Sequence, residues 1–214
     1  MFMPKIIPAI LTNNFSDLED KFKKLKGLTD WVQVDIADGK FVNNVSIKLE
    51  DIAKSDIVKN FSLEIHLMVL NPERYFKDCR KINTKRVAFH FEAVDNLKDV
   101  LSEAEKFSFQ KSLALNPKTS ITKVKPYLAK LDVVVLMSVA PGFQGQKFMR
   151  QILDKIKKLK KMKPEVKIEV DGGINLSNIK KISDSGADYL VVGSSLFKSG
   201  NIKETFKKLK EKIK

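Results

Sequence analysis

Cysteine and arginine are scarce in this sequence of 214 residues. Cys79 is the only cysteine, so no disulfide can form within the chain, which suits a reducing compartment. No apolar run approaches the roughly 20 residues that span a membrane. Residues 1–11 also lack the basic start and long apolar core of a secretion signal. We therefore expect a cytoplasmic protein that does not associate with a membrane.

The scarcity of arginine also bears on the formal net charge of +14. Lysine supplies almost all of this charge, because the only arginines are Arg74, Arg80, Arg86 and Arg150. Nucleic-acid-binding proteins usually rely on arginine for bidentate contacts and place aromatic residues among the basic ones. Here the lysines follow the outward faces of predicted helices. The pattern favours a solvated surface that attracts anionic substrates, and it disfavours nucleic-acid binding.

Short apolar runs, by contrast, recur at regular intervals. Eight of them are rich in Val, Ile and Leu and are bounded by polar residues or glycine, so we predict that they are strands. Several are apolar on both faces, which is typical of a parallel sheet covered by helices. The predicted strands are Lys5–Ile10, Trp31–Ile36, Leu63–Val69, Arg86–Phe91, Lys111–Leu115, Val133–Ser138, Lys167–Asp171 and Tyr189–Gly193.

Lysine-rich amphipathic segments separate these runs and are predicted to be helices. In Ser16–Gly27, a capping serine is followed by Glu19 three residues later, and the segment ends at glycine. Eight strands alternating with eight helices predict a single (β/α)8 barrel, or TIM barrel, over residues 1–214, with a doubly wound open sheet as the alternative. The other predicted helices are Lys48–Lys59, Pro72–Ile82, Asn96–Phe107, Thr119–Leu128, Lys147–Met162, Asn175–Gly186 and Asn201–Lys214.

Two of the predicted strands run directly into glycine-rich turns. The stretches are K-I-E-V-D-G-G-I-N, residues 167–175, and Y-L-V-V-G-S-S-L-F, residues 189–197. Free backbone N–H groups beside a helix start bind phosphate, and TIM barrels often bind phosphate after their last two strands. One such turn could be a mere connection between strand and helix, but two in succession favour a phosphate site.

In a TIM barrel, the side chains at the carboxyl ends of the strands meet at one mouth. Both histidines of the chain fall at such ends. Asp35 and His66 come from successive strands and point inward by strand parity, so together with Asp171 they could hold a divalent cation. A metal-free cluster of hydrogen bonds is the alternative. The residues predicted at the mouth are Gln33, Asp35, His66, Met68, His90, Glu92, Asn116, Met137, Ser138 and Asp171.

The two aspartates come from the second and seventh predicted strands, which are not neighbours in a barrel. They can therefore present carboxylates to opposite faces of one substrate. A two-base proton transfer requires this arrangement, because one group removes a carbon-bound proton and the other returns a proton to the opposite face. A cation would stabilise the enediolate formed between the two steps.

Seven stretches of the sequence, in order, resemble the ribulose-phosphate 3-epimerase family. They are I-I-P-A-I-L, V-D-I-A-D-G-K-F-V, I-H-L-M-V, A-L-N-P-K-T, M-S-V-A-P-G-F-Q-G-Q-K-F, I-E-V-D-G-G-I-N and V-V-G-S-S-L-F. The resemblance covers essentially the whole chain. It implies a metal-assisted epimerase that interconverts D-ribulose 5-phosphate and D-xylulose 5-phosphate at carbon 3.

The resemblance also implies a role for each matching residue. Asp35 would accept the proton and Asp171 would donate one, and both would bind a divalent ion with His66. The ion could be manganese, iron, zinc, cobalt or magnesium. The other implied site residues are the lid Gly142, Phe143, Gln144 and Gly145, the phosphate-binding Gly172, Gly173, Gly193 and Ser194, and the apolar Met68 and Met137.

Four positions depart from the family's pattern. The family has serine at Ala9, a metal-binding histidine at Gln33, methionine at Ala37 and proline at Asn43. A glutamine oxygen is a harder and weaker ligand than imidazole, which favours manganese or magnesium over zinc. An epimerase of another ketose phosphate, or a weakly catalytic paralogue that binds sugar phosphates, remains an alternative. A homo-oligomeric state also remains open.

Overall fold

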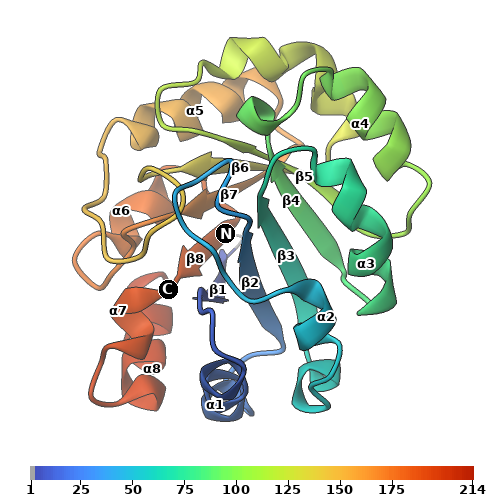
Figure 1. The fold of residues 1–214 in the computed structure, drawn as a ribbon. Helices are drawn as coiled ribbons and strands as arrows, with labels where there is room; N and C mark the ends of the chain where they lie inside the picture. Colours follow the sequence, from blue (N-terminus) through green and yellow to red (C-terminus); the bar gives the residue numbers. More distant parts are fainter. Residues whose placement is uncertain (1–2) are drawn as a thin grey trace.

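The computed structural model describes residues 3–214. Residues 1 and 2, which belong to the domain predicted over 1–214 and to the N-terminal segment 1–11, lie outside the described residues. Eight parallel strands form a closed barrel in sequence order, and the helices lie around it (Figure 1). The (β/α)8 prediction is confirmed; an open sheet is excluded, because β1 pairs with β8. The strands are β1 (Lys5–Ile10), β2 (Trp31–Ala37), β3 (Ser62–Met68), β4 (Arg86–His90), β5 (Gln110–Leu115), β6 (Val133–Met137), β7 (Lys167–Asp171) and β8 (Tyr189–Val192).

The strand β6 shows why several of these runs are apolar on both faces. Val134 and Leu136 belong to the main core, which lies between the barrel and the helices. Val135 and Met137 point the other way and pack with small side chains inside the barrel. Because both faces are buried, the alternation of polar and apolar residues seen in half-exposed strands is lost. All predicted strand ends lie within one residue of those found.

The barrel interior also holds a buried ionic cluster that the sequence did not predict. Arg86 is fully buried and forms ion pairs with Glu64 and with Glu169, the latter at 2.5 Å. The guanidinium group of Arg86 lies over the rings of Trp31 and Tyr189, with its central carbon 5.0 and 4.3 Å from the ring centroids. Burial raises the pKa of Glu169, and the nearby Glu64 raises it further. The cluster fills the barrel beneath the mouth.

The α-helices match seven of the eight predicted segments in order but are shorter, and one short α-helix matches none of them. They are α1 (Phe15–Leu25), α2 (Leu49–Ile52), α3 (Phe76–Lys81), α4 (Leu97–Ala104), α5 (Ile152–Met162), α6 (Ile179–Asp184), α7 (Ser194–Phe197) and α8 (Ile202–Lys212). The predicted cap Ser16 is wrong, because Asn14 caps α1 by accepting a hydrogen bond from the Asp17 N–H. In the described part of the chain, no helix is long and apolar enough to cross a membrane.

Three predicted helices contain 3-10 turns. The helix predicted over 48–59 is replaced by α2 and the 3-10 turn η1 (Ile57–Asn60). The 3-10 turn η2 (Pro72–Tyr75) precedes α3, and the segment predicted over 119–128 forms the 3-10 helix η4 (Ile121–Lys130). Pro126 lies inside η4, where it has no N–H to continue α-helical hydrogen bonding. A fourth 3-10 turn, η3 (Phe91–Ala93), follows β4.

Two predicted helices begin later than expected. Residues 147–151 precede α5 and belong to the connection that follows β6, and Asn175 precedes α6 by four residues. The side chain of Asn175 instead accepts a hydrogen bond from the Ser177 N–H, which forms a turn. The short helix α7 was not predicted, because four residues give no helical period. These shifts leave irregular backbone around the mouth of the barrel.

Candidate active site

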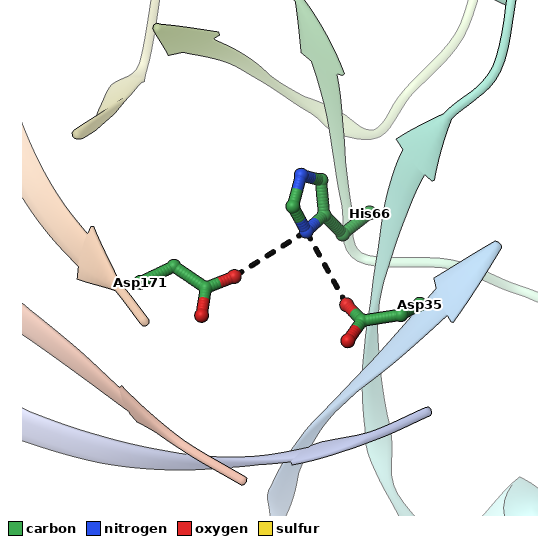
Figure 2. Close-up of side chains that lie close together, drawn as sticks. All are labelled: Asp35, His66 and Asp171. Carbon is green, nitrogen blue, oxygen red and sulfur yellow. Dashed lines mark hydrogen bonds and ion pairs between the residues drawn. The ribbon is translucent and has the colours of Figure 1, made fainter. Parts of the chain in front are cut away.

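Asp35, His66 and Asp171 meet at the carboxyl end of the barrel, as the strand parity predicted. Asp35 on β2 lies opposite His66 on β3 in the sheet register, and Asp171 ends β7. His66 Nδ1 lies 3.3 Å from Asp35 Oδ1 and 3.3 Å from Asp171 Oδ2 (Figure 2). One ligand atom from each residue lies within 4.8 Å of the others. Two carboxylates and one imidazole therefore face a common point.

The side chain of Gln33 reaches this same point from below. Gln33 Nε2 lies 2.8 Å from Asp35 Oδ1, 2.9 Å from Asp171 Oδ2 and 3.3 Å from His66 Nδ1. Its amide group therefore donates hydrogen bonds to both carboxylates. The Gln33 Oε1 atom is buried and has no hydrogen-bond partner among the described residues. The expected ligand orientation, with the amide oxygen facing the cluster, is thus not the one found.

Burial and close contact shift the ionisation of this cluster. Burial alone lowers the pKa of His66, but hydrogen bonds to Asp171 and Asp35 outweigh it and raise the pKa to about 10. Burial raises the pKa of Asp35, and the interaction with His66 only partly offsets this effect. A protonated His66 therefore offsets part of the negative charge of the two carboxylates.

His66 also contacts the second histidine of the chain. His66 Nε2 lies 2.9 Å from Nε2 of His90, which ends β4. His90 Nδ1 lies 3.1 Å from Asn116 Oδ1 and 3.6 Å from Glu92 Oε2. Burial lowers the pKa of His90 to about 4, so this imidazole is neutral. The sequence placed these residues at the mouth but assigned them no role.

A single cavity joins the aspartates to the glycine-rich turns. Gly172 and Gly173 have φ angles of +114° and +63°, and a Cβ on Gly172 would lie 2.4 Å from a methyl carbon of Val139. Glycine is therefore required at the turn after β7. Ser195 Oγ donates a hydrogen bond to the Ile174 carbonyl and so joins this turn to the one after β8. The cavity is lined by all the predicted catalytic, lid, phosphate-binding and apolar residues: Asp35, His66, Met68, Met137, Gly142, Phe143, Gln144, Gly145, Asp171, Gly172, Gly173, Gly193 and Ser194.

The segment after β6 covers one side of this cavity. Gln144 belongs to the connection after β6, and its Nε2 atom lies 3.4 Å from the carbonyl oxygen of Ala9 in β1. Asn44 Nδ2 donates a hydrogen bond of 2.7 Å to the Gly142 carbonyl. Asn44 was missed by sequence reasoning, because it lies in the long connection after β2 and only the folded chain brings it to the lid.

The apolar side of the mouth is more tightly filled than expected. Met68 and Met137 are both buried. Alanine at position 37, where the family has methionine, leaves no empty space, because Val42 and Met68 pack against this residue, together with the partly buried Leu11 and Phe41. Ala9 lines the cavity with its methyl group where a hydroxyl was expected from the family pattern.

Replacing Gly193 with alanine tests the junction between lid and turn. A Cβ at Gly193 would lie 2.9 Å from Gln144 Nε2, so Gly193→Ala should displace Gln144 and raise the KM for a phosphorylated substrate about tenfold, equivalent to roughly 1.4 kcal/mol. Thermal stability should change little, because the nearest atom ends a flexible side chain. Gly200→Ala is the control, since its Cβ would meet nothing within 4 Å. An unchanged KM in Gly193→Ala would contradict this role.

Comparison with known proteins agrees with this geometry. A model of the ribulose-phosphate 3 epimerase family matches residues 5–197. The chain belongs to this family. It is 32% identical to ribulose-phosphate 3-epimerase from Schizosaccharomyces pombe, over 100% of this chain and 95% of that protein. It is 36% identical to ribulose-phosphate 3-epimerase from Buchnera aphidicola, over 96% of this chain and 94% of that protein.

Solved structures show the same fold at low sequence identity. The 3-hexulose-6-phosphate synthase from Salmonella typhimurium superposes with a TM-score of 0.76 at 13% identity, over 98% of each chain. Tryptophan synthase from Mycobacterium tuberculosis gives a TM-score of 0.74 at 12% identity, over 99% of this chain and 93% of that chain. These likenesses concern the barrel fold alone.

Proposed function

We propose that this protein inverts carbon 3 of a ketose phosphate and interconverts D-ribulose 5-phosphate and D-xylulose 5-phosphate. The observation that carries the proposal is the pair Asp35 and Asp171, which come from separate strands and face one cavity that also reaches two glycine-rich turns. The names of the family and of the similar proteins support this reaction. We further propose that the chain acts as one barrel domain over residues 1–214, in the cytoplasm.

The two carboxylates would share the proton transfer. Asp35 removes the proton from carbon 3, and the electron pair of the broken C–H bond moves toward the carbonyl group at carbon 2 to form an enediolate. Asp171, in its protonated form, then donates a proton to the opposite face of carbon 3. The pKa of Asp35 is raised by burial, which makes its carboxylate a stronger base. In the reverse reaction the two residues exchange roles.

The residues at the mouth fit a divalent cation. Asp35, His66 and Asp171 present two carboxylate oxygens and one imidazole nitrogen within 4.8 Å of one another, a donor set suited to manganese, iron, zinc, cobalt or magnesium. A cation held there would supply positive charge that stabilises the enediolate. Gln33 Nε2 lies close to the same three atoms, so the Gln33 amide must withdraw or rotate to turn Oε1 inward when the cation binds.

The remaining cavity residues would bind and enclose the substrate. The backbone N–H groups of Gly172, Gly173, Gly193 and Ser194 would bind its phosphate. The lid residues Gly142, Phe143, Gln144 and Gly145 would cover it, and Met68 and Met137 would exclude water from the enediolate. No role is proposed in binding nucleic acid or a membrane, and homo-oligomer formation stays a prediction.

Exchange of hydrogen with the solvent tests this function directly. Incubation with D-ribulose 5-phosphate in D2O should introduce deuterium at carbon 3, detected by NMR of the recovered sugar phosphate, because the returned proton comes from a solvent-exchanged carboxyl group. The same experiment with other ketose phosphates defines the substrate. Binding of ribulose 5-phosphate without exchange at carbon 3 would refute the epimerase and favour a weakly catalytic sugar-phosphate-binding protein.

A further inference from the structure

We propose that Glu92 and His90 are positioning residues that fix the tautomer of His66, so that Nδ1 of His66 is the nitrogen available to a cation. The inference rests on the proposed cation site at Asp35, His66 and Asp171. It concerns residues that take no part in proton transfer to the substrate. The chain of contacts runs from Glu92 through His90 to His66.

The first step is the fixed orientation of Glu92. Glu92 Oε1 accepts a hydrogen bond of 2.9 Å from the backbone N–H of Asn116 and another from the hydroxyl of Thr119. Burial alone raises the pKa of Glu92, but the interaction with His90 and the hydrogen bonds from Thr119 and the Asn116 backbone lower it below its usual value. Glu92 is therefore ionised at neutral pH, and its carboxylate can only accept hydrogen bonds.

The second step follows from the two atoms that face His90 Nδ1. Both are oxygens, namely Asn116 Oδ1 at 3.1 Å and Glu92 Oε2 at 3.6 Å. Neither oxygen can donate a proton, so Nδ1 of His90 must carry the hydrogen. The His90 ring is completely buried, and its nearest carboxylate oxygen lies 3.6 Å away, beyond hydrogen-bonding distance, so no counter-ion compensates a charge there and the ring carries a single hydrogen. His90 Nε2 is therefore left as an acceptor. Phe41 packs against the His90 ring, with centroids 4.8 Å apart, and helps to fix its plane.

The third step transmits this tautomer to His66. His90 Nε2 and His66 Nε2 are 2.9 Å apart, so the hydrogen between them must belong to His66. Nε2 of His66 is thus occupied as a donor, whether or not Nδ1 carries a proton. The remaining nitrogen, Nδ1, lies 3.3 Å from both Asp35 Oδ1 and Asp171 Oδ2. The relay therefore keeps the lone pair of neutral His66 directed at the point where the carboxylates converge.

Nitrogen-15 NMR of the imidazole rings tests the tautomers in the purified full-length protein. The chain has only two histidines, so the spectrum contains two sets of ring signals, which correlation with the assigned backbone signals attributes to His66 and His90. We expect the neutral His90 to be protonated at Nδ1 and unprotonated at Nε2. A His90 ring protonated at Nε2 in the unsubstituted protein would overturn the proposal by itself, and this measurement needs no substrate and no variant.

Glu92→Gln tests the consequence for metal binding. The new amide can donate a hydrogen bond to His90 Nδ1, so the His90 tautomer should become mixed or reversed. Binding of Mn²⁺, measured by calorimetric titration of metal-free protein, should weaken about 10- to 100-fold, as for other partners of metal-ligating histidines. Glu165→Gln is the matched control, since Glu165 has a side chain that is 72% exposed. Thr119→Val removes the hydroxyl that donates to Glu92 but keeps Glu92 itself, so it should weaken Mn²⁺ binding less than Glu92→Gln does.

The outcomes separate this proposal from the cation site on which it rests. If Glu92→Gln keeps both the His90 tautomer and the Mn²⁺ affinity of the unsubstituted protein, the relay is refuted. If the tautomers are as stated but the unsubstituted protein binds no Mn²⁺, the cation site is refuted and the hydrogen-bond relay stands. If Glu92→Gln does not fold, the spectrum of the unsubstituted protein and the Thr119→Val titration decide.

Discussion

Asp35→Asn and Asp171→Asn are each expected to reduce the epimerisation of ribulose 5-phosphate by at least ~100-fold, the range typical of lost general acid–base groups. An asparagine amide keeps the shape of the carboxyl group but cannot exchange a proton with carbon 3. Both variants should fold, because these side chains project from strand ends into the cavity. An assay coupled to consumption of xylulose 5-phosphate measures the loss, and thermal unfolding monitors the fold.

Asp56→Asn is the control for this pair, because the side chain of Asp56 is 90% exposed and the residue immediately precedes η1. It should keep full activity. The two site variants should also differ from each other in D2O. If the proton transfers are divided as proposed, removal of one base can leave exchange at carbon 3 from one epimer while abolishing the net conversion. Near-normal turnover in either variant would refute the two-base mechanism.

The barrel could be predicted from the sequence because its physical signal repeats eight times. Each strand is short and rich in apolar residues, and an amphipathic segment follows it, so errors in single elements do not change the topology. The helices were predicted less well where local rules compete. Asn14 and Ser16 are both good caps, and only packing of the folded helix selects Asn14. Pro126 was the available signal against a regular α-helix over 119–128, because proline has no N–H for the α-helical hydrogen bond, but it does not specify the 3-10 turns that form instead.

The convergence of Asp35, His66 and Asp171 was predictable because strand parity and barrel closure determine it. The contacts beyond these three were not. The direction of the Gln33 amide depends on which groups face it from β3 and β7, and the contact between His66 and His90 depends on side-chain rotamers. The buried Arg86 was indistinguishable in the sequence from a surface arginine, because its partners Glu64 and Glu169 lie on other strands.

Gln33→His is expected to tighten the binding of a divalent cation about 10- to 100-fold. The amide of Gln33 now donates hydrogen bonds to both carboxylates, at 2.8 and 2.9 Å, and a cation must displace these hydrogen bonds. An imidazole at this position removes the amide and adds a nitrogen ligand, which favours zinc over manganese or magnesium. We therefore expect the unsubstituted protein to contain little tightly bound zinc and to be activated by added manganese.

Metal analysis and thermal unfolding with and without a chelator measure this effect. In the unsubstituted protein, the Gln33 amide still bridges Asp35 and Asp171 when no cation is bound, so a chelator should change the unfolding temperature little. In Gln33→His the carboxylates lose that bridge, so the chelator should lower the unfolding temperature of this variant. Gln151→His, at an exposed position, is the control. A full zinc complement in the unsubstituted protein would refute the view of Gln33 as a weakened ligand.

If Gln33→His binds metal tightly but its activity does not rise, metal binding is not what limits turnover. Ala9 then becomes the next residue to replace, with the serine that the family has at this position.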